Sequence, residues 1–316
     1  MREAFLLLIA VIVVVFYGII PIVGIMITRY KWMQFRKRFN FLRHCKLLDY
    51  RQYRKLENNG EVFRFTGGIE SITDGRILWV KGEDMTIPVS LEKIKCFLLP
   101  IEENDETEAP LQIHWNQVSA LPEGAKVFIG GLVKIQKNSL NFCTTKEEPL
   151  MIIFYNCPDD DLPVSLISRA RSRNDYWNNL TPISLVTGAL ALIFIASSFL
   201  GRPAFHLIVI IAIIAVFIPI LPAVPPGFLF TILGRRIAWN VRKQKAKLEL
   251  MRFGLLPGNK PGNTPSAAEN YGRPNPRYAI KTYIAEFFSW LILLSGVLLN
   301  MIFILIILFQ FEIISF

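Results

Sequence analysis

Charge, cysteine and histidine are all scarce in this chain of 316 residues. Only 19% of the residues are charged, 52% are apolar, and the mean hydropathy is +0.38. This balance excludes an ordinary soluble globular protein, and it also excludes a chain that is disordered throughout. Four cysteines in a chain of this length exclude a disulfide-rich scaffold.

Motifs that bind cofactors or metals are missing as well. The chain has no GxGxxG, P-loop, GxSxG or HExxH pattern. His44 has Cys45 beside it, but no second pair of this kind lies nearby to complete a metal site. Asp159, Asp160 and Asp161 form one dense carboxylate group without the spacing of a calcium loop, and we interpret them as the start of a helix. We therefore predict no metal, no cofactor and no enzymatic activity.

Four long apolar runs dominate the sequence instead. A helix needs about 20 apolar residues to cross a bilayer core of roughly 30 Å. We predict transmembrane helices at residues 1–28, 180–200, 205–224 and 284–311. The first run is too long for a signal peptide and lacks a small-residue cleavage site, which favours an uncleaved anchor. Prolines crowd the second half of the third run, so we expect that helix to end near Val224 and a new helix to begin at Phe228.

Positive charge gathers on one side of these runs. Near the helix ends, 21 lysines and arginines lie on one side and 2 on the other. Because the positive side is normally cytoplasmic, we predict a multi-pass protein of a cell inner membrane with both termini outside. An organelle membrane fits the same pattern.

Residues 57–163 carry the opposite charge, with 9 basic and 18 acidic residues. Short runs with a β pattern, bounded by turn signals, recur at 62–69, 76–80, 85–89, 94–99, 126–135, 140–144 and 150–155. They predict a small all-β domain, barrel-like or OB-like, on the cytoplasmic side. The expected fold class is therefore four transmembrane helices plus this β-domain.

The two halves of the β-domain resemble each other. Residues 67–68 and 130–131 are glycine pairs, and a turn signal follows each pair at the same spacing. A glycine pair in a strand marks a bulge or a sharp coil, which the closure of a small barrel requires. Two similar hairpins that arose by chance would give the same pattern.

An acidic run separates the two halves. It includes Glu102, Glu103, Asp105 and Glu106. Because like charges repel, a solvated loop is one interpretation. A docking site for a basic protein partner is the other.

Two basic amphipathic segments, 29–56 and 228–253, follow the first and third spans. We predict that both lie in the membrane interface. The residues expected to contact anionic lipid are Arg36, Lys37, Arg38, Arg235, Arg236, Arg242 and Lys243. A plain continuation of the first span is the alternative for 29–56. Lipid contact is sufficient to explain the positive charge, so we do not expect nucleic-acid binding.

Two further segments connect these parts. We predict a juxtamembrane helix at residues 164–179. Residues 254–282, rich in glycine, proline and asparagine, read as a flexible linker.

The order of elements around the second span carries a resemblance. The β-domain ends with the run 150–154 and an acidic turn, and Leu166-Ile167-Ser168-Arg169-Ala170-Arg171-Ser172 then leads to a transmembrane helix. Over residues 60–200 this order resembles the membrane-flanked "beside a membrane" (GIDE-type) domain. Such domains lie between two spans in a family of mitochondrial RING ligases and in bacterial relatives. No Cys/His RING pattern follows here, so the resemblance does not imply ubiquitin ligase activity.

These patterns favour a scaffold or interaction protein that presents a membrane-proximal β-domain to a membrane or membrane-associated protein. A component of a membrane transport or lipid-handling system is the alternative, supported by the proline-rich break in 205–224. A lipid-modifying enzyme ranks third, with His44 and the three aspartates as its only candidate residues. Asn300 and the small residues 187–189 suit helix–helix assembly, including assembly with a second copy of the chain.

Overall fold

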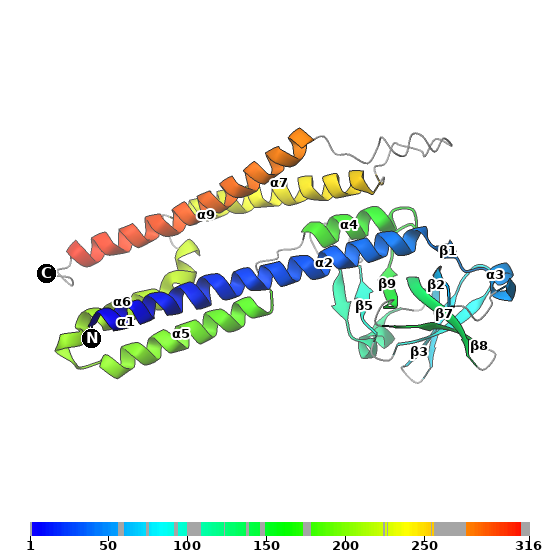
Figure 1. The fold of residues 1–316 in the computed structure, drawn as a ribbon, viewed down its shortest axis with the longest axis horizontal. Helices are drawn as coiled ribbons and strands as arrows, with labels where there is room; N and C mark the ends of the chain where they lie inside the picture. The colour runs from blue at the N-terminus through cyan, green and yellow to red at the C-terminus, as the bar shows by residue number, and fades with distance from the viewer. Residues whose placement is uncertain are drawn as a thin grey trace. The chain divides into compact units, whose positions relative to one another are not determined.

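Figure 1 shows the chain as a computed structural model. The structure describes residues 2–55, 60–73, 76–91, 94–99, 109–122, 124–136, 139–145, 149–172, 178–223, 225, 227–253, 255 and 276–310. The chain divides into two compact units. The helical unit comprises residues 1–31, 174–245 and 274–316, and the β-unit comprises residues 32–173 and 246–273.

The helical unit contains the apolar runs. Its helical elements, of which α2 and α7 also continue into the β-unit, are α1 (Arg2–Ile12), the π-helix η1 (Val13–Ile19), α2 (Ile20–His44), α5 (Leu180–Phe199), the 3₁₀-helix η3 (Pro203–Phe205), α6 (His206–Phe217), the 3₁₀-helix η4 (Ile218–Ala223), α7 (Phe228–Arg252) and α9 (Pro276–Gln310). Four described helical stretches are long and apolar enough to cross a membrane: Arg2–His44, Leu180–Phe199, Pro203–Leu221 and Ile280–Ile304. They coincide with the four expected runs.

Close packing joins α1, α5 and α6. Ile9 of α1, Leu192 of α5 and Ala212 of α6 are all buried in one apolar cluster. Gly188, one of the small residues expected to support helix assembly, lies against Phe16 and Tyr17 of η1. This small residue therefore serves packing within the chain.

The third apolar run is broken, as its prolines indicate. The α-helical part, α6, ends at Phe217, earlier than the expected end near Val224. Pro219 and Pro222 lie in the 3₁₀-helix η4 that follows, where each removes a backbone donor. The new helix α7 begins at Phe228, as expected.

The β-unit contains a mixed sheet. Its strands are β1 (Lys46–Leu47), β2 (Val62–Thr73), β3 (Ile77–Lys81), β4 (Thr86–Ser90), β5 (Cys96–Leu98), β6 (Leu111–Ile113), β7 (Lys126–Gln136), β8 (Ser139–Cys143) and β9 (Met151–Tyr155). The path runs β4-β3-β2-β7-β9-β5-β6, with β1 on β2 and β8 on β7. The seven expected strands are confirmed. The very short β1 and β6 were not expected.

The two similar halves fold as two similar hairpins, β2–β3 and β7–β8. The pair Ile69–Val80 of the first corresponds to Leu132–Cys143 of the second. Their long strands, β2 and β7, pair antiparallel with each other. The internal likeness of the sequence therefore corresponds to a likeness of local structure.

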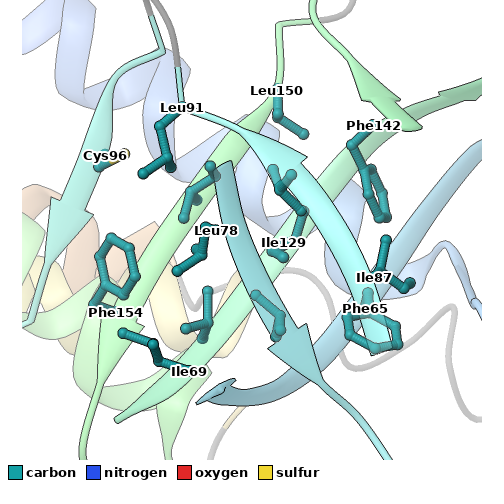
Figure 2. Close-up of a cluster of buried hydrophobic side chains, with 14 of the residues drawn as sticks. Phe65, Ile69, Leu78, Ile87, Leu91, Cys96, Ile129, Phe142, Leu150 and Phe154 are labelled. Carbon is teal, nitrogen blue, oxygen red and sulfur yellow. The ribbon is translucent and has the colours of Figure 1, made fainter. Parts of the chain in front are cut away.

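One face of the sheet forms a strand-lined core. Figure 2 shows side chains from separate strands meeting there, including Phe65, Leu78, Ile129 and Phe154. Along β3, buried Leu78 alternates with exposed Ile77, as expected where one face meets a core.

Helices cover part of the other face of the sheet. The apolar stripe of α2, Trp32, Phe35, Phe39 and Leu42, packs there together with α4 (Leu162–Ser172) and with Leu250 near the end of α7. All five residues of β9 are buried, because alternate residues face the strand-lined core and this helical layer.

This packing corrects the interfacial interpretation of residues 29–56. Most of the segment, up to His44, is a continuation of the first helix. Helix α2 continues unbroken to His44, and β1 and the short helix α3 (Tyr50–Lys55) follow. The alternative, a continuation of the first helix, is the one observed.

Candidate functional site

The residues expected to contact lipid fall into two groups. Lys37, Arg235, Arg236 and Lys243 are exposed, and Arg38 and Arg242 are half-buried. Lipid contact by these six stays a prediction. Arg36 is different, because its side chain is only 3% exposed.

Arg36 belongs to a partly buried ion pair instead. Its Nε donates to the Glu249 carboxylate at 2.5 Å, and Arg171 of α4 approaches the other oxygen of the same carboxylate at 3.7 Å. Arg43 also donates to the backbone oxygen of Phe253 at 3.4 Å. Arg36 is therefore withheld from lipid headgroups, and the expectation of a lipid contact is wrong for this residue. These contacts attach the end of α7 to α2 and α4 within the β-unit.

The first half of α7 also differs from the expected surface helix. Ser289 of α9 donates to the backbone oxygen of Gly234 at 3.0 Å, and further along the two helices Thr282 contacts Gln244. Gly227, just before α7, bonds Asn300 of α9. Helix α7 therefore runs antiparallel along the apolar stretch of α9, whereas an interfacial helix would lie across the end of a span.

Asn300 is the polar centre of this contact. It is 2% exposed, accepts a bond from the Gly227 N–H at 2.9 Å and donates to the Leu221 oxygen at 2.5 Å. It thus satisfies backbone groups on both sides of the proline-rich break. The expected bond from Asn300 to a neighbouring helix is confirmed within the chain.

An ion-pair cluster lies in the first third of α9. The Glu286 carboxylate forms ion pairs with Lys245 of α7 and with Arg29 of α2, and the second of these has an N–O distance of 3.3 Å. Lys245 also stands 5.2 Å from the ring centre of Tyr283. Both basic residues belong to the positive clusters of the sequence, so part of that charge is neutralised inside the helical unit.

The acids proposed for partner docking, Glu102, Glu103, Asp105 and Glu106, lie outside the described residues. Their chain position is still informative, because the acidic run connects β5 to β6. Asp159 is described, exposed and paired with Lys126 at 2.8 Å. The three aspartates directly precede α4, where the sequence led us to expect a helix start.

A pocket lies beside the ends of β5 and β9. Its volume is about 220 Å³. It is lined by Leu98, Leu121, Pro122, Gly124, Ala125, Phe154, Tyr155 and Asn156. Carbon atoms make up much of this wall, which suits an apolar side chain better than a charged ligand.

Two ionisable groups at and near the pocket, Tyr155 and Cys157, are held in their neutral forms. Burial, together with the neighbouring Asp159, raises the pKa of Tyr155. Burial also raises the pKa of the Cys157 thiol. A nucleophilic cysteine needs a lowered pKa, so this thiol is a poor nucleophile.

Among the described residues, no group of three or more His, Cys, Asp or Glu side chains is arranged to hold a metal ion. His44 and Cys45 each bond a backbone oxygen one helical turn earlier, those of Asn40 and Phe41. Both side chains therefore bond backbone groups at the end of α2.

The sheet edge at β6 was missed by sequence reasoning. Within the described part of the chain, β6 pairs with β5 and with no other strand. Its first residue, Leu111, is 53% exposed. Three residues are too few to show a period-2 pattern, so composition offered no signal beyond the flanking Pro110.

Comparison of the chain with protein-family models, with curated proteins and with solved structures gives no match.

Proposed function

We propose that this protein is a multi-pass membrane scaffold whose β-unit binds a protein partner. The observation that carries the proposal is the construction of the β-unit. It has its own strand-lined core and its own helical layer, and among the described residues β6 is paired on one side only, beside a pocket with both apolar and polar lining. Exposed backbone groups and apolar surface of this kind are what protein recognition uses.

We further propose that the β-unit is OB-like and cytoplasmic. Strands β2, β3, β4, β8 and β7 follow one another in space, because β4 lies beside β8 and β7 pairs with β2. This circular order is typical of a small five-stranded barrel. The resemblance to "beside a membrane" domains over residues 60–200 agrees with such a module between two spans. Orientation in a cell inner membrane is inferred from the positive flanks.

Partner recovery tests the scaffold function. The full chain, purified in mild detergent, should retain a protein partner at fixed stoichiometry. A chain without residues 57–163 should lose that partner and still resist alkaline extraction from membranes. The deletion uncovers the apolar stripe of α2, so a second variant that keeps the domain is needed. The variant carrying E102Q, E103Q, D105N and E106Q should weaken recovery of the partner and leave the fold intact. Absence of any stoichiometric partner for the unaltered chain contradicts the proposal.

Thiol labelling tests the orientation. Cys143 and Cys157 are both half-buried, so each is suited to a single-cysteine variant. Neither should react with an impermeant maleimide in intact cells, and both should react after permeabilisation. Reaction from outside would reverse the proposed topology.

A transport or lipid-handling role is the second candidate, and one observation favours it. The third apolar stretch is a discontinuous helix whose break lies against Asn300 in the apolar part of α9. Broken helices within a membrane often mark a substrate site. Lipid or solute that co-purifies at fixed stoichiometry, and is lost in Asn300→Leu, would favour this role over the scaffold.

A further inference from the structure

We propose that the β-unit binds a phosphate monoester between two arginines, Arg43 of α2 and Arg64 of β2. The phosphate group can belong to a lipid headgroup or to a small soluble molecule, and the chemistry of recognition is the same in both cases. The scaffold function does not require this site, so the two proposals are tested separately.

The register of the sheet places Arg64 on the side of β2 that faces α2. Phe63 and Phe65, its neighbours in β2, both belong to the strand-lined core. Because successive strand residues point to opposite faces, the Arg64 side chain lies on the face that carries the helical layer. Arg64 pairs with Gly130 of β7, and a Cβ atom at Gly130 would lie 2.7 Å from Leu42 of α2. Arg64 is therefore beside the last turn of α2.

Arg43 follows Leu42 in that last turn, in the part of α2 that belongs to the β-unit. The positive charge of Arg64 is close enough to act on Arg43. Two guanidinium groups of like charge therefore meet on the helix-covered face of the sheet. The C-terminus of a helix favours one nearby cation, which accounts for Arg43. It does not account for a second guanidinium group from β2.

The protein itself compensates little of this charge. Among the described residues, neither arginine forms an ion pair with a carboxylate. Nη2 of Arg43 donates to the Phe253 backbone oxygen at 3.4 Å and lies 3.4 Å from Nε2 of His44. Nε of Arg64 is buried, and in the described part of the chain it has no hydrogen-bond partner. A buried donor next to a second positive charge is an arrangement that an oxyanion satisfies.

Charge and shape favour a phosphate monoester over other anions. A monoester carries about 1.5 to 2 negative charges at pH 7 and three strong acceptor oxygens. Two guanidinium groups supply two positive charges and planar forks of N–H donors, which match phosphate oxygens two at a time. A carboxylate or a phosphate diester carries a single negative charge and would leave one arginine uncompensated.

The site is accessible along β1. Leu47 is the partner of Arg64 in the parallel pair of β1 and β2, and it is 44% exposed. Both residues of β1 are exposed, and among the described strands β1 pairs with β2 alone. His44, directly before this turn into β1, is exposed as well, whereas Arg43 and Arg64 are half-buried. A ligand can therefore reach the two arginines from this edge of the sheet.

Titration with a soluble monoester is the first arm of the test. The full chain is reconstituted in nanodiscs of phosphatidylcholine and titrated with glycerol 3-phosphate in a calorimeter. Acetate, which carries one negative charge, is the matched probe. If the phosphate comes from a soluble molecule, we expect glycerol 3-phosphate to bind at one molecule per chain and acetate not to bind.

Lipid-borne phosphate is the second arm. The full chain in mild detergent is titrated with fluorescent phosphatidic acid, a monoester, and with fluorescent phosphatidylglycerol, a diester. Binding of phosphatidic acid alone assigns the site to a lipid headgroup, and binding of glycerol 3-phosphate alone assigns it to a soluble ligand. Equal binding of the two lipids, or binding of neither monoester, overturns the proposal.

Two matched variants locate the contact. Arg64→Gln removes one guanidinium group and should weaken binding of the monoester by about tenfold or more, equivalent to about 1.4 kcal/mol. Lys81→Gln removes one positive charge from an exposed position of β3 in the same unit and should change the affinity less than twofold. Equal effects of the two variants overturn the proposal.

Thermal unfolding distinguishes a ligand site from a structural role of Arg64. Without phosphate, Arg64→Gln should unfold at no lower temperature than the unaltered chain, because the change removes a like-charged neighbour of Arg43. With the monoester present, the unaltered chain and Lys81→Gln should be stabilised, and Arg64→Gln should not. A large loss of stability in Arg64→Gln without phosphate would assign this arginine to the fold and overturn the proposal.

Discussion

The backbone N–H of Gly227 donates a hydrogen bond to the side-chain oxygen of Asn300, 2.9 Å away and 73 positions later in the chain. The amide nitrogen of the same side chain donates to the oxygen of Leu221. One residue of α9 therefore forms hydrogen bonds with backbone groups on both sides of the proline-rich break between η4 and α7. In an apolar setting, an unpaired backbone group costs considerably more than the same group in water.

Replacing Asn300 by leucine should therefore destabilise the helical unit. The variant loses two buried hydrogen bonds and leaves both backbone partners without that side chain. We expect a loss of about 1–3 kcal/mol in the free energy of unfolding. Reversible unfolding of the full chain in mixed micelles measures it.

Ser295→Ala is the control in the same helix. The Ser295 hydroxyl bonds Ile292 of its own helix, so its removal should cost much less. Equal losses of unfolding free energy in the two variants would mean that the Asn300 hydrogen bonds do not stabilise the proline-rich break.

Gly130→Ala should weaken the contact between α2 and the sheet. A Cβ atom at residue 130 would lie 2.7 Å from a methyl carbon of Leu42, and Leu42 is fully buried and cannot easily give way. Overpacking of this kind costs about 1–3 kcal/mol. The labelling rate of the buried Cys96 thiol under mild denaturant reports opening of the β-unit.

Gly68→Ala provides the comparison for this change. The nearest atom to a Cβ at residue 68 is 3.6 Å away, an ordinary contact. The labelling rate of Cys96 in the Gly68→Ala variant should stay close to that of the unaltered chain. A rate that rises as much as in Gly130→Ala would contradict the packing described for Leu42.

Glu249→Ala should destabilise the β-unit strongly, because it leaves Arg36 buried without its carboxylate. Breaking one partner of a buried pair costs about 3–5 kcal/mol. The double variant Arg36→Met, Glu249→Leu removes both charges and should be much less destabilised than Glu249→Ala. A double-mutant cycle of Arg36→Met, Glu249→Leu and their double variant, on unfolding free energies, measures the coupling, and simple additivity of the two changes would show that the pair is not coupled.

Stability of the β-unit should fall at alkaline pH, in part through Cys96. Burial raises the pKa of this thiol from 9.0 to about 12, so the folded state keeps a proton that the unfolded state releases. The stabilising contribution is complete below pH 9 and is lost as the pH rises from 9 towards 12. Over that window one released proton corresponds to a slope of about 1.4 kcal/mol per pH unit.

Cys96→Val removes this titration and keeps an apolar side chain of similar size. Its unfolding free energy should fall less steeply between pH 9 and 12 than that of the unaltered chain. Parallel slopes for the two proteins would exclude a contribution from the thiol.

Local patterns predicted much of the secondary structure. The run 76–80, rich in strand-forming residues and preceded by the turn signal Thr73-Asp74-Gly75, predicted β3. The continuous apolar run Met151–Tyr155 revealed β9, which is buried on both faces. The two-residue β1 and three-residue β6 escaped notice, because so short a run carries no measurable period.

Local patterns did not predict which part of the chain covers each apolar face. The spacing of apolar residues in α2 predicts an apolar helix face, and the structure packs that face against the sheet and α4. Arg36 lies on the same helix among exposed basic residues, and composition could not single it out as buried. Periodicity indicates that a face is buried and contains no information about what covers it.

The sequence by itself determined the four apolar stretches, the proline break and the seven main strands, because length, hydropathy and backbone propensity act over neighbouring residues. Only the tertiary structure decided that Arg36 meets Glu249, 213 positions away, and that Asn300 closes the break at Gly227. It also decided that β6 ends the strand path among the described residues. Such pairings depend on which distant surfaces fit together in shape, charge and hydrogen bonding, and no local pattern records that choice.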